Sequence, residues 1–297
     1  MLPYDIEADW YVHRWCDFGC AYCIVGARPR LWYRRQWDIA AVERFLDARG
    51  LRWLVHFTGG EPFDLAEFVD LCRAITAGHC ISVNSNLTPD CVLEFAEHIA
   101  PERVAFVHAS LHIESREQRG QVPDLVAKVH LLRDRGFRVF VSQVMAPGVF
   151  PRFADDYRSL RDQGLIVHPK VLRGRFRGTA YPAAYTAARR AAFKEFHATA
   201  LRDSPGPPDA GGESLSIDLR HDAVLVDGIP EFRGRPCQAG SRFVRVLADG
   251  TVTRCDNTTV LGHVGRNELR LADGPTPCDT RSCPYFCLKY SQAAPAA

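Results

Sequence analysis

The sequence predicts an α/β fold, a partial (β/α)6 TIM barrel followed by a small C-terminal β-hairpin domain. Three observations predict it. Six short apolar stretches alternate with segments of helical periodicity between residues 10 and 171. A proline- and glycine-rich stretch at 203–213 then breaks this alternation. Beyond it, two alternating stretches flank an Asp-Gly turn. Six units are too few for a closed eight-stranded barrel, so we expect an open one with the helices outside.

Length and composition agree with this division. We place the barrel at residues 1–202, a linker at 203–213 and the smaller domain at 214–297. A hydrophobic content of 46% is ordinary for a packed core. A net charge of +2 predicts binding neither to nucleic acid nor to a membrane surface. The amino terminus is acidic and lacks a long apolar run, so we expect no signal peptide, no membrane span and a cytoplasmic location.

The first strand is expected at 10–14, and it leads into three cysteines with C-x3-C-x2-C spacing, Cys16, Cys20 and Cys23. Thiolates at this spacing converge on one small inorganic body if the backbone curls tightly, and Gly19 is expected to allow that curl. Three thiolates on a cubane of four irons leave one iron open to a substrate or cofactor. Eleven cysteines without a secretion signal also point to metal and thiol chemistry in a reducing compartment.

This cysteine loop, with the aromatic Tyr22 before its last cysteine, resembles the radical S-adenosylmethionine (radical SAM) enzymes. The resemblance implies a [4Fe–4S] cluster whose open iron chelates S-adenosyl-L-methionine. An electron, delivered by a donor such as flavodoxin or ferredoxin, would cleave the cofactor to a 5′-deoxyadenosyl radical that takes a hydrogen atom from an unactivated carbon. The alternatives are a zinc site, which prefers four protein ligands, or a disulfide, which does not suit a cytosolic enzyme.

The second unit carries a glycine-rich motif. A helix is expected at 37–48 and a strand at 52–57, followed by Gly59, Gly60, Glu61 and Pro62. A Gly-Gly pair lets backbone amides approach a ligand, and a neighbouring carboxylate can accept from an ammonium group. Alone, the motif is equally typical of a plain turn. After this cysteine loop it matches the radical SAM motif that holds the methionine amino group, so the resemblance implies that these four residues bind the cofactor.

The third and fourth units place polar residues at strand ends. Strands are expected at 80–84 and 104–108, and the nearby Cys72, Cys80 and Cys91 are most simply core thiols. Asn84 and Ser110 would point into the mouth of the barrel, where ligands bind. In radical SAM enzymes these positions commonly meet the cofactor or the substrate.

His112 and Glu114 follow the fourth strand. Alternation in an extended segment would place both side chains on one face, where they are candidate substrate contacts. A satisfied histidine and a surface glutamate are the plain alternative.

The last two units end in arginines. A helix at 125–132 stops at Gly136, and strands are expected at 137–145 and 165–171, separated by a helix at 151–163. A cation after the sixth strand would pair with the methionine carboxylate. Of Arg173, Arg175 and Arg177, we expect Arg173 to do so.

The C-terminal hairpin, 241–247 and 251–255, is framed by cysteines. The pattern C-x12-G-x4-C, from Cys237 to Cys255, is followed by Cys278, Cys283 and Cys287. It resembles the twitch domain, the shorter form of the SPASM domain, which implies a second [4Fe–4S] cluster. A structural zinc ribbon is the alternative, although the cysteine spacing is not that of a usual zinc knuckle.

Five cysteines exceed the four ligands that one cluster needs. Cys278, Cys283 and Cys287 lie close enough in sequence to share a cluster, with Cys237 completing it. Cys255 would then keep its S–H proton and act as a hydrogen-atom donor. In the family pattern the cysteine after G-x4 is usually a ligand, and then Cys278 or Cys283 would be spare.

The role of Cys255 decides the predicted reaction. A free thiol would return hydrogen to the opposite face of a substrate radical, which is epimerisation. If every thiol near the substrate is a ligand, the second cluster would accept an electron from a ketyl radical, which is dehydrogenation of an amino-sugar or aminocyclitol alcohol. The architecture resembles aminoglycoside-tailoring radical SAM enzymes, epimerases among them.

An aminoglycoside-like substrate is polycationic and needs acidic partners. Acidic residues expected near the mouth are Asp17, Glu114, Asp218, Asp222, Asp227, Glu231 and Asp256. Of these, Asp256 adjoins Cys255 and is the candidate substrate contact.

Two further alternatives for the function are a peptide (RiPP) maturase and an iron–sulfur carrier. A maturase would need a separate leader-binding partner, because only a short segment precedes Cys16.

Overall fold

The computed structural model describes residues 3–23, 36–204, 222–255, 259–281 and 290. Six parallel strands form one side of a single sheet, each paired with the next in chain order. They are β1 (Ile6–His13), β2 (Trp53–Gly59), β3 (Cys80–Ser85), β4 (Val104–Ser110), β5 (Val139–Val144) and β6 (Val167–Lys170). The predicted parallel α/β fold is confirmed, with a strand at each of the six expected places.

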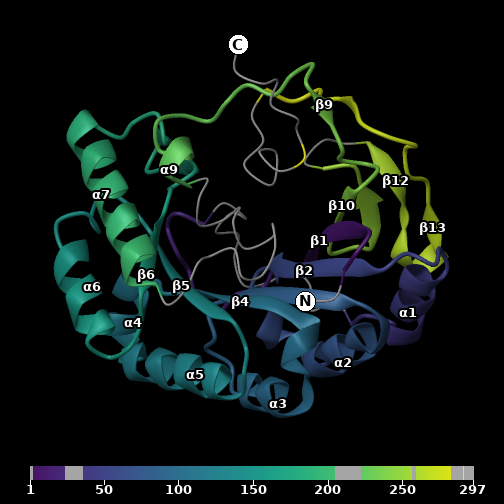
Figure 1. The fold of residues 1–297 in the computed structure, drawn as a ribbon, viewed down its shortest axis with the longest axis horizontal. Coiled ribbons are helices and arrows are strands. Elements are labelled where there is room, and N and C mark those ends of the chain that lie inside the picture. Colours follow the sequence, from purple (N-terminus) through teal and green to yellow (C-terminus); the bar gives the residue numbers. More distant parts are fainter. Residues whose placement is uncertain (1–2, 24–35, 205–221, 256–258, 282–289, 291–297) are drawn as a thin grey trace.

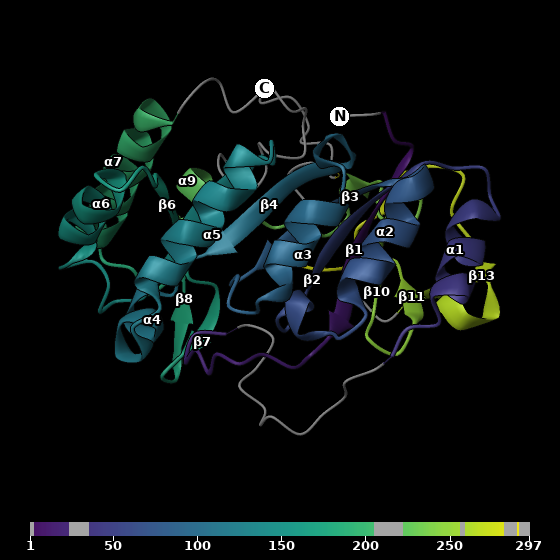
Figure 2. The ribbon, with the colours of Figure 1, turned by 90° about the horizontal axis from the view of Figure 1, so that it is seen from below.

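Helices cover the outer face of this curved sheet (Figure 1, Figure 2). They are α1 (Ile39–Asp47), α2 (Phe68–Gly78), α3 (Cys91–His98), α4 (Ile113–Arg119), α5 (Val122–Asp134), α6 (Phe153–Arg161) and α7 (Ala187–Asp203). This is the arrangement expected of right-handed crossovers between parallel strands. Within the described ranges, no helix has the length and apolar character that a bilayer-spanning segment needs.

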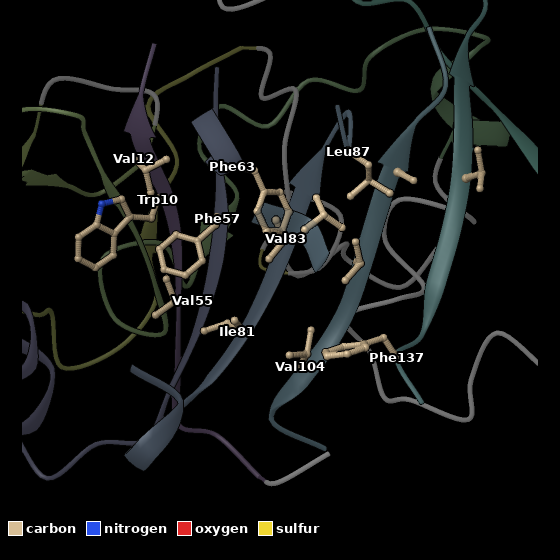
Figure 3. Close-up of a cluster of buried hydrophobic side chains, with 14 of the residues drawn as sticks. Trp10, Val12, Val55, Phe57, Phe63, Ile81, Val83, Leu87, Val104 and Phe137 are labelled. Carbon is tan, nitrogen blue, oxygen red and sulfur yellow. The ribbon is translucent and has the colours of Figure 1, made fainter. Parts of the chain in front are cut away.

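The core lies between the sheet and the helices. Alternate residues of β1 point toward the helices, and Trp10 packs edge-on against Trp37 with ring centroids 4.9 Å apart. Figure 3 shows Trp10, Phe57 and Val83 on neighbouring strands of the same layer. Cys72 and Cys80 are fully buried, as expected of core thiols.

The concave face of the sheet carries buried polar side chains beside a small apolar cluster of Leu54, Cys80, Ala105, Phe106 and Phe140. His56 on β2 approaches Glu7 Oε2 with Nε2 at 3.0 Å and Ser82 Oγ with Nδ1 at 2.6 Å. Asp9 pairs with Arg245 at 2.7 Å. These groups are almost inaccessible, and each is paired, as buried polar groups must be to avoid a large desolvation cost.

The predicted hairpin is present, and it continues the same sheet. β10 (Phe243–Val246) pairs parallel with β1, and β11 (Thr251–Thr253) pairs antiparallel with β10. β12 (Val260–His263) and β13 (Glu268–Leu269) extend the sheet to ten strands. Gly250 in the turn has a φ of +88°, which favours glycine. The division into two domains stays a prediction, because most of the proposed linker lies outside the described residues.

The structure also contains elements that were not predicted. β7 (Gly174–Phe176) and β8 (Thr179–Tyr181) form a small hairpin after β6, and α7 follows it. Only Phe193, His197 and Ala200 of α7 are buried, so the helix shows little apolar periodicity. α9 (Asp222–Leu225) lies beyond the linker and packs near α7 (Figure 1).

Candidate active site

The cysteine loop follows the carboxyl end of β1 and is held by α4. The guanidinium groups of Arg116 and Arg119 lie over the Phe18 ring, 5.3 and 4.6 Å from its centroid. Arg119 also donates to the Asp17 backbone oxygen at 2.9 Å and pairs with its carboxylate at 3.4 Å. A helix that the sequence did not reveal therefore fixes the loop that carries Cys16, Cys20 and Cys23.

Gly19 does not need to be glycine. Its φ is outside the left-handed region, and a Cβ added there would meet nothing within 4 Å. The expectation that this residue supplies a special curl is therefore wrong, because other residues can adopt the same backbone conformation. Tight packing against α4 shapes the loop instead.

Gly59 and Gly60 are glycines because two backbone segments meet there. Gly60 N donates to the His13 oxygen at 2.9 Å, and Glu61 N donates to the Trp15 oxygen at 2.7 Å. A Cβ on Gly60 would lie 1.6 Å from the Trp15 oxygen, and one on Gly59, whose φ is +121°, would lie 2.3 Å from the His13 oxygen. The end of β2 is thus pressed against the chain that enters the cysteine loop.

The Glu61 carboxylate is buried and fully hydrogen-bonded. The side chain is 1% exposed, and burial raises its pKa to about 8. Its oxygens accept hydrogen bonds from Ser85 Oγ at 2.6 Å, Asn86 N at 2.6 Å and Phe63 N at 3.1 Å. Pro62 begins a short 3-10 helix, Pro62–Asp64. We expected this carboxylate to accept from a ligand ammonium group. In the structure it fastens the end of β3, and its contact with a cofactor stays a prediction.

Polar residues at the ends of β3 and β4 do lie together. Ser110 Oγ donates to Asn84 Oδ1 at 3.4 Å, and both side chains are half-buried. Sequence reasoning missed Asn86, although a polar residue directly after a strand was the signal for it. Its amide donates to Asp17 Oδ1 at 2.7 Å and lies 3.8 Å from Cys16 Sγ.

His112 faces the cysteine loop. Its Nδ1 lies 2.8 Å from Tyr22 Oη and 3.5 Å from Cys20 Sγ. Burial, and then the nearby Arg116, lower the pKa of His112 to about 4, so the ring is neutral. The expectation that His112 and Glu114 share a face of an extended segment is wrong, because α4 begins at Ile113 and residues two apart on a helix point in different directions. Glu114 is exposed in the first turn of α4.

Arg173 is buried in an ion pair. The side chain is 8% exposed, and its Nη2 lies 2.7 Å from Oδ1 of Asp222, which is itself buried. The pair joins the segment after β6 to α9. Arg175 is exposed on β7, and the Arg177 guanidinium lies over the Phe176 ring at 5.3 Å. The expected pairing of Arg173 with a methionine carboxylate stays a prediction, with Asp222 already neutralising its charge.

Three C-terminal cysteines lie in one small cluster. Cys237 is on β9 (Pro236–Cys237), which pairs antiparallel with β14 (Thr276–Pro277), just before Cys278. Cys237 is 3% exposed and Cys278 5%, and both pack with Phe232, Ala239, Phe243 and Tyr290. Cys255 is half-buried against this cluster. Cys283, Cys287 and Asp256 lie outside the described residues.

The chemistry of the first three side chains suits an iron–sulfur cluster, because thiolates are soft ligands of iron. In the described part of the chain, no three histidine, cysteine or acidic side chains converge closely enough to hold one metal ion. A cubane spaces its thiolates more widely, because each binds a different iron. Burial raises the pKa of Cys16, and that of Cys20 to about 11, and bound iron would oppose this shift by favouring the thiolates. The amide of Asn86 and the groups around Cys20 supply donors to the sulfurs.

A profile of the Radical SAM superfamily matches residues 10–159, about half of the chain. A comparison with curated proteins finds no match.

Solved structures share the fold at low identity. SuiB from Streptococcus suis is 15% identical with a TM-score of 0.56, over 85% of this chain and 60% of SuiB. Native anSMEcpe with bound AdoMet is 15% identical with a TM-score of 0.58, over 87% of this chain and 78% of that one. BtrN in complex with AdoMet and 2-DOIA is 12% identical, covering 90% and 80% of the two chains, but its TM-score of 0.43 gives it no weight. The chain thus spans about three fifths of SuiB.

Proposed function

The chain belongs to the radical SAM superfamily, and from that premise we propose that it is an epimerase of an aminoglycoside-type sugar. Members of the superfamily use S-adenosyl-L-methionine and a [4Fe–4S] cluster. When bound, these supply the 5′-deoxyadenosyl radical that removes a carbon-bound hydrogen atom, with an electron from a flavodoxin or ferredoxin. The protein then has to bind the sugar, present one carbon and return hydrogen to its opposite face.

In this proposal the cysteine loop holds the first cluster through Cys16, Cys20 and Cys23. The ends of β2, β3 and β4 surround the loop, and they would hold the cofactor. Three contacts support this arrangement: Glu61 N to the Trp15 oxygen at 2.7 Å, Asn86 to Asp17 at 2.7 Å, and Ser110 to Asn84 at 3.4 Å. Proposed cofactor contacts are Tyr22, Gly59, Gly60, Glu61 and Pro62 through their backbone, Asn84, Ser110 and Arg173.

The observation that carries the epimerase proposal is the unequal burial of the C-terminal thiols. Cys237 and Cys278 are 3% and 5% exposed, whereas Cys255 is half-buried. A hydrogen-atom donor has to touch the substrate, and of these three thiols Cys255 is the most accessible. We therefore assign Cys237, Cys278, Cys283 and Cys287 to a second [4Fe–4S] cluster and keep Cys255 as the donor.

The thiol chemistry balances as follows. Cys255 gives its sulfur-bound hydrogen atom to the substrate carbon radical, so an S–H bond breaks and a C–H bond forms. The thiyl left on Cys255 needs one electron and one proton to become a thiol again. The electron is proposed to come from the second cluster and the proton from solvent.

Acidic groups beside the cysteine loop support a cationic substrate. Glu114 is exposed at the start of α4 and lies near enough to Tyr22 to influence its pKa. A carboxylate in this position suits an ammonium group of an amino sugar. His112 contacts Tyr22 and Cys20, so its proposed role shifts from the substrate to the loop. Asp256, next to Cys255, remains a proposed substrate contact.

Dehydrogenation of an amino-sugar or aminocyclitol alcohol is the second candidate. The observation in its favour is that Cys255 packs against the cluster of side chains that contains Cys237 and Cys278. If Cys255 is a ligand, Cys278 or Cys283 is the spare thiol, and if every thiol near the substrate is a ligand, the substrate radical would give up an electron to the second cluster.

Peptide modification is a third candidate. SuiB has been solved bound to the precursor peptide SuiA, and anSMEcpe bound to the Kp18Cys peptide. These likenesses concern the fold, and the chain spans only 62% of SuiB in the peptide-bound structure. A carrier of iron–sulfur clusters is disfavoured because the fold match covers most of the chain.

The test is anaerobic reconstitution with iron, sulfide, S-adenosyl-L-methionine and dithionite in deuterated water, with a set of aminoglycosides as substrates. The proposal predicts an inverted carbon that carries solvent deuterium. Oxidation of an alcohol without deuterium would identify a dehydrogenase instead. Cys255→Ala is expected to keep both clusters and form 5′-deoxyadenosine while losing inversion. Loss of about four irons per chain in this variant would make Cys255 a ligand.

A further inference from the structure

The sulfur of Cys20 is surrounded by hydrogen-bond donors. His112 Nδ1 lies 3.5 Å from Cys20 Sγ, and the side chains of Tyr22 and Ser115 are hydrogen-bonded to the same sulfur. Cys16 Sγ has different partners, which are the backbone at Phe18, the amide of Asn86 at 3.8 Å and the Asp17 carboxylate at 3.8 Å. Ser115 and His112 both come from the beginning of α4. The three cysteines are therefore not equivalent, because the Cys20 sulfur contacts polar side chains from the beginning of α4.

The donors around Cys20 form an ordered chain. Tyr22 has one hydroxyl proton, and His112 Nδ1 lies 2.8 Å from the same oxygen. If the hydroxyl donates to the Cys20 sulfur, its oxygen accepts from Nδ1–H of a neutral imidazole. The order is then His112 to Tyr22 to Cys20, and it fixes the His112 proton on Nδ1. A thiolate at Cys20 favours this order, because both donors then point toward the negative charge.

The backbone at His112 is strained to make this contact. It adopts φ +49° and ψ 51°, the left-handed region, immediately before α4. The ring meets Phe18 edge-on with centroids 5.5 Å apart and stacks on Tyr22 at 5.9 Å. Such strain in a residue other than glycine is often found at functional sites. Here the left-handed backbone conformation of His112 points its imidazole at the cysteine loop.

We propose that Tyr22 and Ser115 raise the reduction potential of the first cluster by donating hydrogen bonds to Cys20, and that His112 orients the Tyr22 hydroxyl for this by donating to its oxygen. Reduction adds one electron to the cluster from a low-potential donor, with no bond broken and no proton transferred. Hydrogen bonds to the sulfur stabilise the more negative, reduced state relative to the oxidised one. The three residues are positioning residues that act through Cys20. The inference rests on the proposed assignment of Cys20 to the cluster.

The test is a potentiometric titration of the reconstituted protein without S-adenosyl-L-methionine, followed by EPR of the reduced cluster. Three variants remove one donor each: Tyr22→Phe and His112→Phe keep their rings, and Ser115→Ala removes a hydroxyl. His98→Phe is the matched control, because His98 is exposed on α3 and contacts the Glu94 oxygen. At a fixed potential we expect the ratio of reduced to oxidised cluster to fall roughly three- to tenfold per donor, a modest share of a hydrogen bond to a charged group. The control is expected to match the wild type.

The outcomes separate the inference from the proposed function. An unchanged or increased ratio in Tyr22→Phe and Ser115→Ala, with iron content equal to that of the wild type, would overturn the inference and leave the first cluster in place. An equal fall in His98→Phe would also overturn it. A wild-type chain that binds no [4Fe–4S] cluster would overturn the proposed function itself. If His112→Phe does not fold at its strained backbone position, the other two variants decide the question.

Discussion

The carboxylate of Glu61 accepts a hydrogen bond of 2.6 Å from the backbone N of Asn86. This bond joins the glycine-rich motif after β2 to the end of β3, and Asn86 in turn reaches Asp17 in the cysteine loop. Three segments that are distant in sequence are thereby tied together around the proposed cluster.

Replacing Glu61 with glutamine is expected to destabilise the fold. A glutamine has one oxygen, so its NH2 group would face a donor from Ser85 or Asn86. We expect a loss of about 1–3 kcal/mol in the free energy of unfolding, the cost of leaving a buried donor unpaired. Denaturant unfolding measures it. Ser85→Ala is a comparison with a cost of the same kind, because Ser85 Oγ donates to Glu61 and also accepts from Leu87 N at 2.7 Å. Equal stability of Glu61→Gln and wild type would contradict the assignment.

Stability is also expected to depend on pH through Glu61. Burial raises its pKa from 4.5 to about 8, so the folded chain keeps a proton that the unfolded chain has lost. The contribution of this proton is complete at low pH, and it is lost as pH rises from 4.5 through about 8. The free energy of unfolding should therefore fall over this range in the wild type, and less in Glu61→Gln. If the free energy of unfolding changed with pH in the same way in both proteins, Glu61 would not be the source of the pH dependence.

Gly60→Ala is expected to disturb the cysteine loop. The added methyl group would lie 1.6 Å from the Trp15 oxygen, so the backbone has to move. We expect a cost of roughly 3 kcal/mol, as for overpacking of a rigid site, together with less iron per chain after reconstitution. Gly19→Ala is the matched control, because it has open space and an ordinary φ. Equal iron content in the two variants would show that the close approach at Gly60 is not needed.

Variants of Arg173 and Asp222 distinguish a structural role of this ion pair from binding of the cofactor by Arg173. Both side chains are buried, and removing one partner of such a pair costs about 3–5 kcal/mol. If the role is structural, Asp222→Asn and Arg173→Met both destabilise the fold, and the double variant Arg173→Met with Asp222→Leu recovers much of the loss. Unfolding and equilibrium binding of S-adenosyl-L-methionine are the measurements. A stable Arg173→Met variant that no longer binds the cofactor would favour the role that the sequence suggested.

Glu114→Gln tests the proposed cationic substrate. Glu114 is exposed, so removing its charge is expected to raise the KM for an aminoglycoside only roughly two- to fivefold, the range of exposed ion pairs. Glu97→Gln on α3 is the control, since Glu97 is exposed and pairs with Arg135 on the helical face. The steady-state rate over a range of ionic strength measures both. The substrate class would be wrong if the two variants behaved alike.

The sequence predicted the six barrel strands, but it did not predict the helix and the contacts that position the candidate site. Apolar runs marked all six barrel strands, because both faces of a parallel sheet are buried. α4 was missed because its buried side chains are Ile113 and Arg116, and a buried arginine gives no apolar signal. The helix assignment at α4 then decided where His112 and Glu114 point, so a local error changed the predicted site.

Other features depend on contacts that no local pattern contains. The chain from Glu7 through His56 to Ser82 needs the register of three strands. The hairpin was predicted from its turn, but its parallel pairing with β1 joins opposite ends of the chain. The Asn86 contact to Asp17 is of the same kind. Residue types and spacing revealed the cysteines, whereas the side chains that hold them came from the structure.

The most direct test of the account is EPR of the anaerobically reconstituted and reduced protein, before and after S-adenosyl-L-methionine is added. The account predicts a [4Fe–4S] signal that changes when the cofactor binds, and that is lost when Cys16, Cys20 and Cys23 are all changed to alanine while the C-terminal cysteines are kept. A signal that does not respond to the cofactor, or zinc at these three thiols, would contradict it.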